Sequence, residues 1–370
     1  MKIVCDRDKL NAGLQIVSKA IPSKTTMSIL EYILIDATGP EIRLIGNDME
    51  LGIETVIEGE IVEHGFIALN ARYFCDIVKK LPDTTVELVQ GENYKVTITA
   101  NKVKFNIIGR AGEEFSYLPS IEKIDGVEMS QYALKNVINQ TIFAIAGGNE
   151  GNRMMSGELM EIKEDVLKLV ALDGHRISIR RVLLSGKYAQ KKAVIPGKTL
   201  SELSKILSDS TENMVEIYFT GKHVMFTFNK TIVVSRLIEG EYFNIDQMLS
   251  SDYETKMTIS RKEMLESIDR AMLFVKEGDK KPVILGITEN VMELKINTTA
   301  GSLNENIEIE KQGKDLMIGF NPKFLIDALR VIEDEQVDIY FVNPKAPCFI
   351  RNKEESYTYL ILPINFTTVD

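Results

Sequence analysis

Apolar residues recur along the chain with two different periods. Spacings of three and four residues predict amphipathic helices in six segments, 6–20, 72–80, 131–142, 197–208, 261–276 and 321–332. In the fifth segment, the predicted buried face consists of Leu265, Ile268, Met272 and Val275. Alternating runs predict antiparallel strands between the helices, among them Val96–Thr99, Val224–Phe228 and Tyr357–Leu360. Ser260 precedes one helix at the position of an N-cap, and Pro322 suits the first turn of the last helix. The pattern therefore predicts an α+β protein, with pairs of helices packed on one face of antiparallel sheets.

The same order of elements occurs three times, at steps of about 125 residues. Similar strand segments surround Leu44, Leu169 and Leu294. A basic residue opens the second helix of each copy, and it recurs as Arg72, Lys198 and Lys323. The repeat predicts three domains, 1–125, 126–253 and 254–370, each with two helices and antiparallel strands. Copies with similar end surfaces can continue head to tail, and they close into a ring or extend as a filament.

Composition excludes several classes of protein. The chain has 370 residues, of which 44% are apolar and 26% charged, and these values are ordinary for a globular protein and unlike those of a disordered chain. No apolar run approaches the roughly 18 residues that a membrane span needs. The three cysteines, Cys5, Cys75 and Cys348, are too scattered for a disulfide framework or a zinc site, and they favour a cytoplasmic protein without a metal.

The net charge of −10 argues at first against a nucleic-acid partner, but the charge is unevenly distributed. The six predicted helices carry a net charge of +7, and the rest of the chain carries −17. Lys and Arg are good helix formers, which is the simpler explanation of this contrast. The alternative is a positive surface lined by helices, with an acidic exterior that repels DNA. The threefold recurrence of one basic residue favours the alternative.

Motifs for nucleotide binding or catalysis are absent from the sequence. It contains no phosphate-binding glycine loop and no nucleophile elbow, and we expect no cofactor. The segment Asp173–Arg176 places the imidazole of His175 near a carboxylate, but no Ser or Cys partner is identifiable. We therefore expect His175 to be a turn or binding-surface residue. An enzyme that uses His175, or a self-associating scaffold protein without DNA retention, remains open as an alternative.

Two sequence strings and the threefold repeat resemble one family, the bacterial DNA polymerase III beta subunits or sliding clamps. The strings are Val170–Ile177 and Leu362–Phe366, and the similarity extends to Met27–Leu30 near the start of the chain. The resemblance implies a DNA clamp fold and a head-to-tail homodimer whose six repeats close into a ring. Such a ring is not an enzyme; it encircles duplex DNA and tethers the replicative DNA polymerase. An ATP-dependent clamp loader and other clamp-binding replication and repair proteins are the further partners implied, with no membrane involved.

The resemblance also implies three sets of site residues. A partner-peptide cleft between the second and third repeats would consist of Met155, Leu172, Gly174, His175, Arg176, Ile177, Phe243, Gln247, Met248, Lys345, Pro347, Leu362, Pro363 and Ile364. DNA contacts would come from Lys24, Arg72, Asn149, Arg153, Lys198 and Asn321, to which the repeat adds Lys323. The subunit interface would bury Phe105 of one copy against Leu273 and Phe274 of another. Phe243 stands where the family usually has Pro, and Asn365 where Arg is common.

Overall fold

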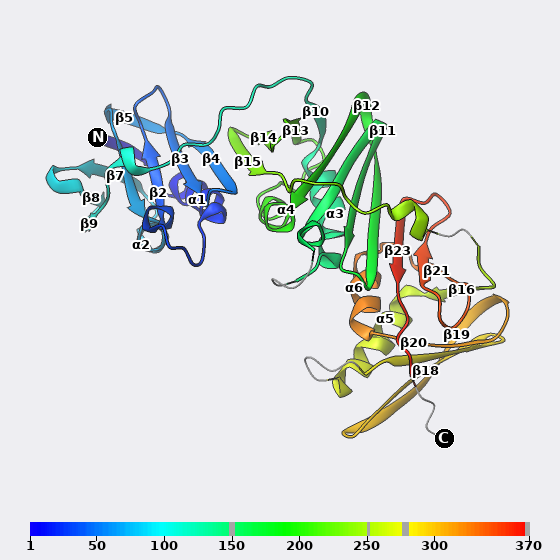
Figure 1. The fold of residues 1–370 in the computed structure, drawn as a ribbon. Coiled ribbons are helices and arrows are strands. Elements are labelled where there is room, and N and C mark those ends of the chain that lie inside the picture. Colours follow the sequence, from blue (N-terminus) through cyan, green and yellow to red (C-terminus); the bar gives the residue numbers. More distant parts are fainter. Residues whose placement is uncertain (148–151, 250–251, 276–280, 367–370) are drawn as a thin grey trace. The chain divides into compact units, whose positions relative to one another are not determined.

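The contacts of the chain divide it into two compact units. The computed structural model describes residues 1–147, 152–249, 252–275 and 281–366 (Figure 1). The first unit combines Met1–Tyr132 with Glu202–Leu237, and the second combines Ala133–Ser201 with Ile238–Asp370. The middle repeat of the sequence therefore contributes strands to both units.

The first unit contains two antiparallel sheets, with the strand orders β5-β1-β7-β8-β9 and β10-β13-β14-β15-β4-β3-β2-β6. The strands of the smaller sheet are β1 (Lys2–Asp6), β5 (Gly59–Glu63), β7 (Thr85–Gln90), β8 (Lys95–Ala100) and β9 (Val103–Ile108). Those of the larger sheet are β2 (Tyr32–Asp36), β3 (Ile42–Asn47), β4 (Leu51–Ile57), β6 (Phe66–Asn70), β10 (Val127–Ser130), β13 (Met214–Phe219), β14 (His223–Phe228) and β15 (Thr231–Arg236). Strand β15 of the middle repeat pairs with β4 of the first repeat.

The second unit contains an antiparallel arrangement of ten strands in the order β11-β12-β23-β22-β21-β16-β19-β18-β17-β20. Their bounds are β11 (Gly157–Leu172), β12 (Arg176–Pro196), β16 (Thr255–Ser260), β17 (Val283–Thr288), β18 (Val291–Thr298), β19 (Gly301–Gly313), β20 (Leu316–Phe320), β21 (Gln336–Phe341), β22 (Cys348–Arg351) and β23 (Tyr357–Ile361). Here β12 of the middle repeat pairs with β23 of the last repeat. Because strands pair across the repeat boundary in both units, the compact units cut through the middle repeat.

All six predicted helices occur in the described part of the chain. They are α1 (Arg7–Val17), α2 (Ala71–Lys80), α3 (Gln131–Asn139), α4 (Gly197–Ser204), α5 (Arg261–Ala271) and α6 (Pro322–Val331). Short 3-10 turns follow three of them, at Ser18–Ala20, Ile142–Ala144 and Met272–Phe274, so the α-helical parts are shorter than predicted. The hydroxyl of Ser260 accepts a hydrogen bond from the backbone N–H of Glu263, and Pro322 is the first residue of α6, as the sequence predicts.

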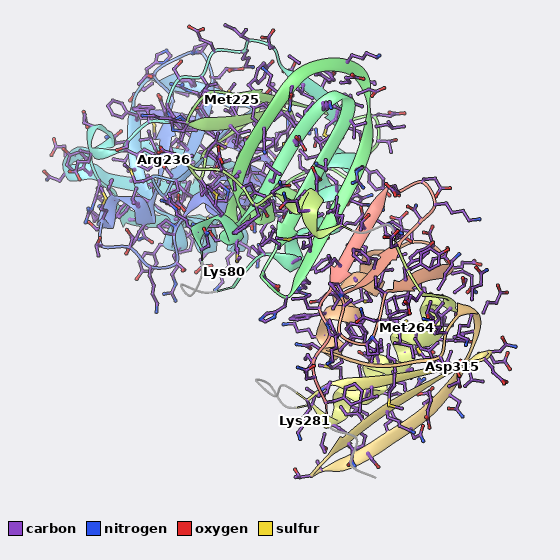
Figure 2. All side chains as sticks on the ribbon, turned by 45° about the vertical axis from the view of Figure 1, so that its right-hand side comes forward. Lys80, Met225, Arg236, Met264, Lys281 and Asp315 are labelled. Atoms are coloured by element: carbon purple, nitrogen blue, oxygen red, sulfur yellow. The ribbon has the colours of Figure 1, made fainter. Side chains whose placement is uncertain are left out.

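The buried face of α5 begins one residue earlier than predicted. Met264 is fully buried, whereas Leu265 is only partly buried; Figure 2 labels Met264 within the second unit. Both residues are apolar, so helical spacing fits either one. Met264 and Ile268 share one core with Leu294 of β18 and Leu329 of α6. The helices of this repeat therefore pack on a sheet face, as the amphipathic pattern predicts.

Candidate functional site

One aspartate fixes the turn between β11 and β12. The Oδ1 atom of Asp173 accepts hydrogen bonds from the backbone N–H groups of His175 (2.9 Å) and Arg176 (3.1 Å). Gly174 has a φ of +85°, a conformation that costs glycine little because it has no Cβ. The Asp-Gly-His-Arg segment thus encodes the turn itself, and it leaves His175 exposed.

The register of neighbouring strands brings together residues that lie far apart in the sequence. Arg176, the first residue of β12, is opposite Ile361, the last residue of β23. One step beyond this pair, the backbone N–H of Leu362 donates a hydrogen bond to the carbonyl oxygen of His175 (2.9 Å). Pro347 immediately precedes β22, the other neighbour of β23. Four members of the predicted cleft therefore lie at the same end of adjacent strands: His175, Arg176, Pro347 and Leu362.

Four further members of the predicted cleft belong to one apolar cluster. Leu172 and Ile177 are opposite one another on β11 and β12, and both are buried. Met155 and Phe243 pack against the same cluster and are partly buried. Methionine and aromatic side chains provide an adaptable apolar area. We call these four residues, together with His175, Leu362 and Pro347, the partner surface.

Arg176 is buried and fully engaged within the fold. Its guanidinium donates from Nε to Asp173 (2.9 Å), from Nη1 to Asp327 of α6 (2.7 Å), and from Nη2 to the carbonyl oxygen of Phe143. The ring of Phe324, also on α6, lies 4.4 Å from the guanidinium carbon. Adjacent strand residues face opposite sides of a sheet, so this side chain is directed away from Ile177 and its apolar cluster. The contacts make Arg176 a tie between β12 and α6.

The other predicted cleft residues are not part of this apolar cluster. Gln247 and Met248 are exposed in the 3-10 turn Ile245–Met248. Lys345 is exposed in the segment before β22. Pro363 and Ile364 continue beyond β23, and the N–H of Ile364 donates to a carbonyl oxygen of β20 (2.8 Å). The role of all the predicted cleft residues stays a prediction.

A buried carboxyl group lies in β11, in the same strand as Leu172. Glu158 Oε2 is 2.7 Å from Thr141 Oγ1, which also lies 2.9 Å from the carbonyl oxygen of Val137 and has only one hydrogen to donate. Among the described residues, Glu158 Oε1 has no hydrogen-bond partner. Burial raises the pKa of Glu158 to about 8, because a carboxylate is poorly solvated there. Glu158 is therefore mainly protonated in the folded protein at neutral pH.

The recurring basic residue occupies the same place in all three repeats. Arg72, Lys198 and Lys323 are each the second residue of a helix (α2, α4 and α6), and each is exposed. None of these three helices has an acidic residue in its first turn. The helix dipole disfavours a positive charge at this end. Helix stability therefore does not explain why the basic residue recurs here.

The remaining predicted DNA contacts have different environments. Lys24 is exposed in the segment between α1 and β2, and Arg153 is exposed in the 3-10 turn Arg153–Ser156. The side chain of Asn321 accepts a hydrogen bond from the N–H of Lys323 (3.0 Å), so it is the N-cap of α6. Asn149 lies outside the described residues.

The predicted interface residues lie beside strand edges. Phe105 is in β9, the last strand of the smaller sheet, and its neighbour Ile108 is 67% exposed. Leu273 is 84% exposed in the turn after α5. The ring of Phe274 in the same turn packs on Gly301, the first residue of β19, where an added Cβ would come within 2.6 Å of that ring.

The described residues show neither a metal centre nor a membrane span. They contain no group of three or more His, Cys, Asp or Glu side chains that could hold a metal ion. Cys5, Cys75 and Cys348 are free thiols. Within the part of the chain that the structure describes, no helix is long and apolar enough to cross a bilayer.

Comparisons with known proteins agree along almost the whole chain. Family models of the DNA polymerase III beta subunit match in sequence order: the N-terminal domain at residues 1–119, the central domain at 128–244 and the C-terminal domain at 246–365. The beta sliding clamp of Staphylococcus aureus (strain Mu50) is 35% identical over 375 residues, which cover 98% of this chain and 99% of that protein.

Solved structures give the same result. A chain described as a DNA polymerase III beta subunit from Eubacterium rectale is 57% identical, with a TM-score of 0.96, and the match covers 99% of this chain and 100% of that one. The DNA polymerase sliding clamp from Bacillus subtilis is 34% identical, with a TM-score of 0.95 and the same coverage. These matches confirm the α+β fold of three repeats and the resemblance read from the sequence. The chain belongs to the DNA polymerase III beta subunit family, the sliding clamps.

Proposed function

We propose that two copies of this chain form a closed ring around duplex DNA and tether the replicative DNA polymerase to it. The family is that of a processivity subunit, which is not catalytic. The proposed mechanism is steric: a closed protein ring cannot leave circular DNA without opening, so weak phosphate contacts suffice and sliding stays fast. The three domains of each copy would be residues 1–125, 126–253 and 254–370.

The observation that carries the DNA part of the proposal is the recurring basic residue. Arg72, Lys198 and Lys323 stand where a helix dipole disfavours positive charge, yet the position is basic in all three repeats. A phosphate near these helix ends would be attracted both by the basic side chain and by the positive end of the helix dipole. We infer that all three residues face the DNA.

Two strand edges support the homodimer. Strand β9 is the end of its sheet and exposes Val103, Phe105 and Ile108. In β19, residues 301–308 pair with β18, whereas pairing with β16 begins only at Ile309. Among the described strands, these two edges have one side without a strand partner. Exposed edges of this kind pair readily with another chain.

Charge also favours contact between these two edges. Lys102 and Lys104 flank the start of β9, and the exposed Glu308 lies in the edge segment of β19, where Glu305 is held by Arg270 of the same chain. Opposite charges facing each other across paired strands stabilise the pair. The exposed Leu273 lies in the turn next to the start of β19 and adds apolar area to this edge.

The proposed partners meet the protein at the partner surface. An apolar area with a few polar groups to orient an extended segment suits a short peptide of the polymerase. An ATP-dependent clamp loader and other replication and repair proteins would use the same surface in turn. The free thiols are consistent with a cytoplasmic location.

Retention on DNA circles tests the ring directly. The protein is loaded on nicked circular DNA, washed at high salt, and the DNA is then linearised. We expect retention on the circle and release after linearisation, because the link is topological. Equal behaviour on circular and linear DNA would favour the scaffold alternative. An enzyme that uses His175 would instead lose a measurable turnover in the His175→Ala variant while partner binding is unchanged.

The phosphate contacts are tested by charge reversal. The triple variant Arg72→Glu, Lys198→Glu, Lys323→Glu should reduce the salt dependence of DNA binding, because the log–log slope falls by about 0.9 for each phosphate that is no longer neutralised. The matched control reverses three exposed hairpin lysines, Lys222, Lys230 and Lys353. Equal effects of the two triple variants would mean that only net charge matters, and would refute the assignment.

The interface is tested by placing charge in the exposed turn. The double variant Leu273→Asp, Phe274→Asp should have half the mass of the unmodified protein by light scattering. The control Ile124→Asp changes an exposed apolar residue elsewhere and should leave the mass unchanged. An unchanged mass in the double variant would remove this interface assignment.

A further inference from the structure

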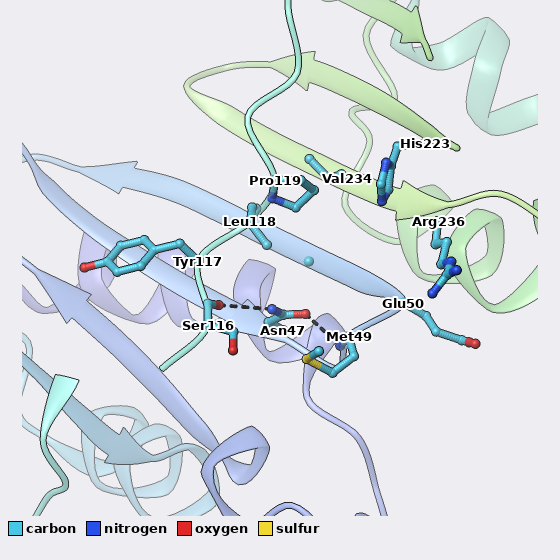
Figure 3. A pocket seen from close by; sticks show the side chains of 11 residues that line it. Asn47, Met49, Glu50, Ser116, Tyr117, Leu118, Pro119, His223, Val234 and Arg236 are labelled. Atoms are coloured by element: carbon cyan, nitrogen blue, oxygen red, sulfur yellow. Dashed lines mark hydrogen bonds between the residues drawn. The ribbon is translucent and has the colours of Figure 1, made fainter. Parts of the chain in front are cut away.

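A small cavity lies in the first unit, where the first repeat meets the middle repeat. It has a volume of about 120 Å³, and its lining includes Asn47, Met49, Leu118, His223, Val234 and Arg236 (Figure 3). Strand β4 of the first repeat pairs here with β15 of the middle repeat. We call this place the first junction, and the pairing of β12 with β23, which carries the partner surface, the second junction.

The backbones of the two junctions are equivalent. Gly52 is opposite Val234 in the first junction, and Ile177 is opposite Leu360 in the second, at positions one repeat step apart. The cross-strand hydrogen bond of the next row is also repeated. The N–H of Arg236 donates to the carbonyl oxygen of Glu50 (2.8 Å). In the same way, the N–H of Leu362 donates to the carbonyl oxygen of His175 (2.9 Å).

The turns beside the two junctions are built in the same way. The Oδ1 atom of Asp48 accepts hydrogen bonds from the N–H groups of Glu50 (3.0 Å) and Leu51 (2.7 Å), as Asp173 Oδ1 does from the two residues after Gly174. Met49 has a φ of +76°, close to the +85° of Gly174. A side chain in this conformation costs about 1–2 kcal/mol, a cost that glycine avoids. Met49 therefore carries its side chain into the cavity lining at a conformational cost.

The side chains of the two junctions differ in size and charge. The counterpart of Ile177 is Gly52, so the first junction lacks a side chain where the second has a buried isoleucine. Leu118, from the segment between β9 and β10, packs on Gly52, and the cavity lies beside it. Arg236 stands at the position of Leu362, and His223 at that of Pro347. Figure 3 shows His223 and Arg236 on one side of the cavity, and Glu50, which also lines it, lies next to Arg236.

We propose that this cavity is a second docking site, for a peptide segment of a partner protein that presents an apolar side chain next to a carboxylate. This inference rests on the proposed function, in which the equivalent partner surface binds peptides. The volume suits one side chain, since a cavity of roughly 150 Å³ holds a benzene ring. It is too small for a cofactor, whose pockets are typically about 300–1,000 Å³. The apolar walls Met49, Leu118 and Val234 receive the side chain, and Arg236 and His223 attract the carboxylate.

The full-length protein with ¹³C-methyl methionine tests the proposal by NMR. The probe is acetyl-Ala-Leu with a free C-terminal carboxylate, and its matched control is the same peptide with a C-terminal amide. The Met49 methyl resonance is assigned with the Met49→Leu variant. It should shift saturably on titration with the acid, with a Kd of about 1 mM, and should shift little with the amide. Arg236→Gln should weaken binding of the acid by about tenfold or more, equivalent to about 1.4 kcal/mol.

Variants at the second junction separate the two sites. Leu362→Gln, the counterpart of the Arg236 change, should leave the Met49 shift intact. Equal shifts with acid and amide, no loss with Arg236→Gln, or a loss with Leu362→Gln would each overturn the proposal. Retention on nicked circles is measured on the same preparation. A retained ring without probe binding overturns this inference alone, and probe binding without retention overturns the proposed function alone.

Discussion

The first and second junctions share one backbone and differ in the side chains that it carries. An aspartate holds each turn, at Asp48 and at Asp173, and each junction repeats the same cross-strand hydrogen bond. The second junction buries Ile177 and presents Leu362, whereas the first has Gly52 and Arg236 at those positions. The turn and the strand register therefore set the geometry, and a few side chains at the strand ends set what can bind there. Under the two proposals, one framework supports two different recognition surfaces in the same chain.

The largest expected difference between the junctions is at Arg176, whose counterpart in the first junction is Leu51. Both side chains are buried, but Arg176 pairs with Asp173 and Asp327 while Leu51 has only apolar packing to lose. Arg176→Ala should destabilise the second unit by about 3–5 kcal/mol, because it leaves two largely buried carboxylates without their partner. Leu51→Ala should destabilise the first unit by about 2–5 kcal/mol through the cavity alone. Urea unfolding followed by hydrogen exchange in β12 and β4 measures the two losses separately.

A double-mutant cycle distinguishes ion pairing from packing at Arg176. Asp327→Ala alone and together with Arg176→Ala gives the coupling between the two side chains. We expect a coupling energy of about 1 kcal/mol or more, since removing the second charge relieves part of the damage. Strict additivity would mean that the guanidinium acts only by filling space, as Leu51 does.

The next difference is pH-dependent and concerns Glu158 of β11, in the second unit. The positions one repeat step away are Ile33 and Val283, both fully buried and apolar. The pKa of Glu158 is raised from 4.5 to about 8 by burial, so between these values the folded state holds a proton that the unfolded state releases. Stability should therefore fall as pH rises through this window, by about 1.4 kcal/mol per pH unit from this group, and level off above it. Below pH 4.5 the group contributes its full stability, since it is protonated in both states.

Glu158→Val, which copies the other repeats, should remove this slope. Thermal unfolding at pH 5, 6.5 and 8 gives the difference between variant and parent, in which the other titrating groups cancel. The variant should gain stability relative to the parent as pH rises. Glu158→Gln keeps the shape and hydrogen-bonding capacity and should remove the slope as well. A difference that is constant with pH would show that Glu158 is ionised in the folded protein.

Much of the fold is encoded in local patterns, and these were predicted correctly. Helical spacing predicted all six helices, and the recurring basic residue does lie at the start of α2, α4 and α6. The phase of α5 was wrong by one residue because Met264 and Leu265 are both apolar. The predicted helices extend too far at their C-terminal ends where a 3-10 turn follows the α-helix, as at Met272–Phe274 after α5. Local spacing does not distinguish these two kinds of turn.

The pairing of strands that lie far apart in the sequence could not be predicted from the local hydrophobic pattern. The pairing of β15 with β4, and of β12 with β23, depends on which sheet edges meet, and alternation within one strand carries no information about that. Two other features have a signal in the sequence repeat. Applying the repeat step to Leu172 leads to Asn47 in the first junction, and applying it to Glu158 leads to two buried apolar positions. Strand alternation likewise indicates that Arg176 faces away from Ile177.

The smallest expected change in stability comes from substitutions at the two equivalent turns, at Gly174 and Met49. Gly174→Ala should destabilise the protein by about 1 kcal/mol, because its φ of +85° disfavours a Cβ even though the space around it is open. Met49→Gly relieves the same kind of cost but loosens the unfolded chain, so its net effect on stability should stay within about 1 kcal/mol. The same variant removes an apolar wall of the cavity and should weaken binding of the carboxylate peptide, observed at the remaining methionines of the first unit. Thermal unfolding and the peptide titration together separate the turn from its side chain. A Met49→Gly protein that binds the peptide as well as the parent would show that the strained residue serves the turn and not the cavity.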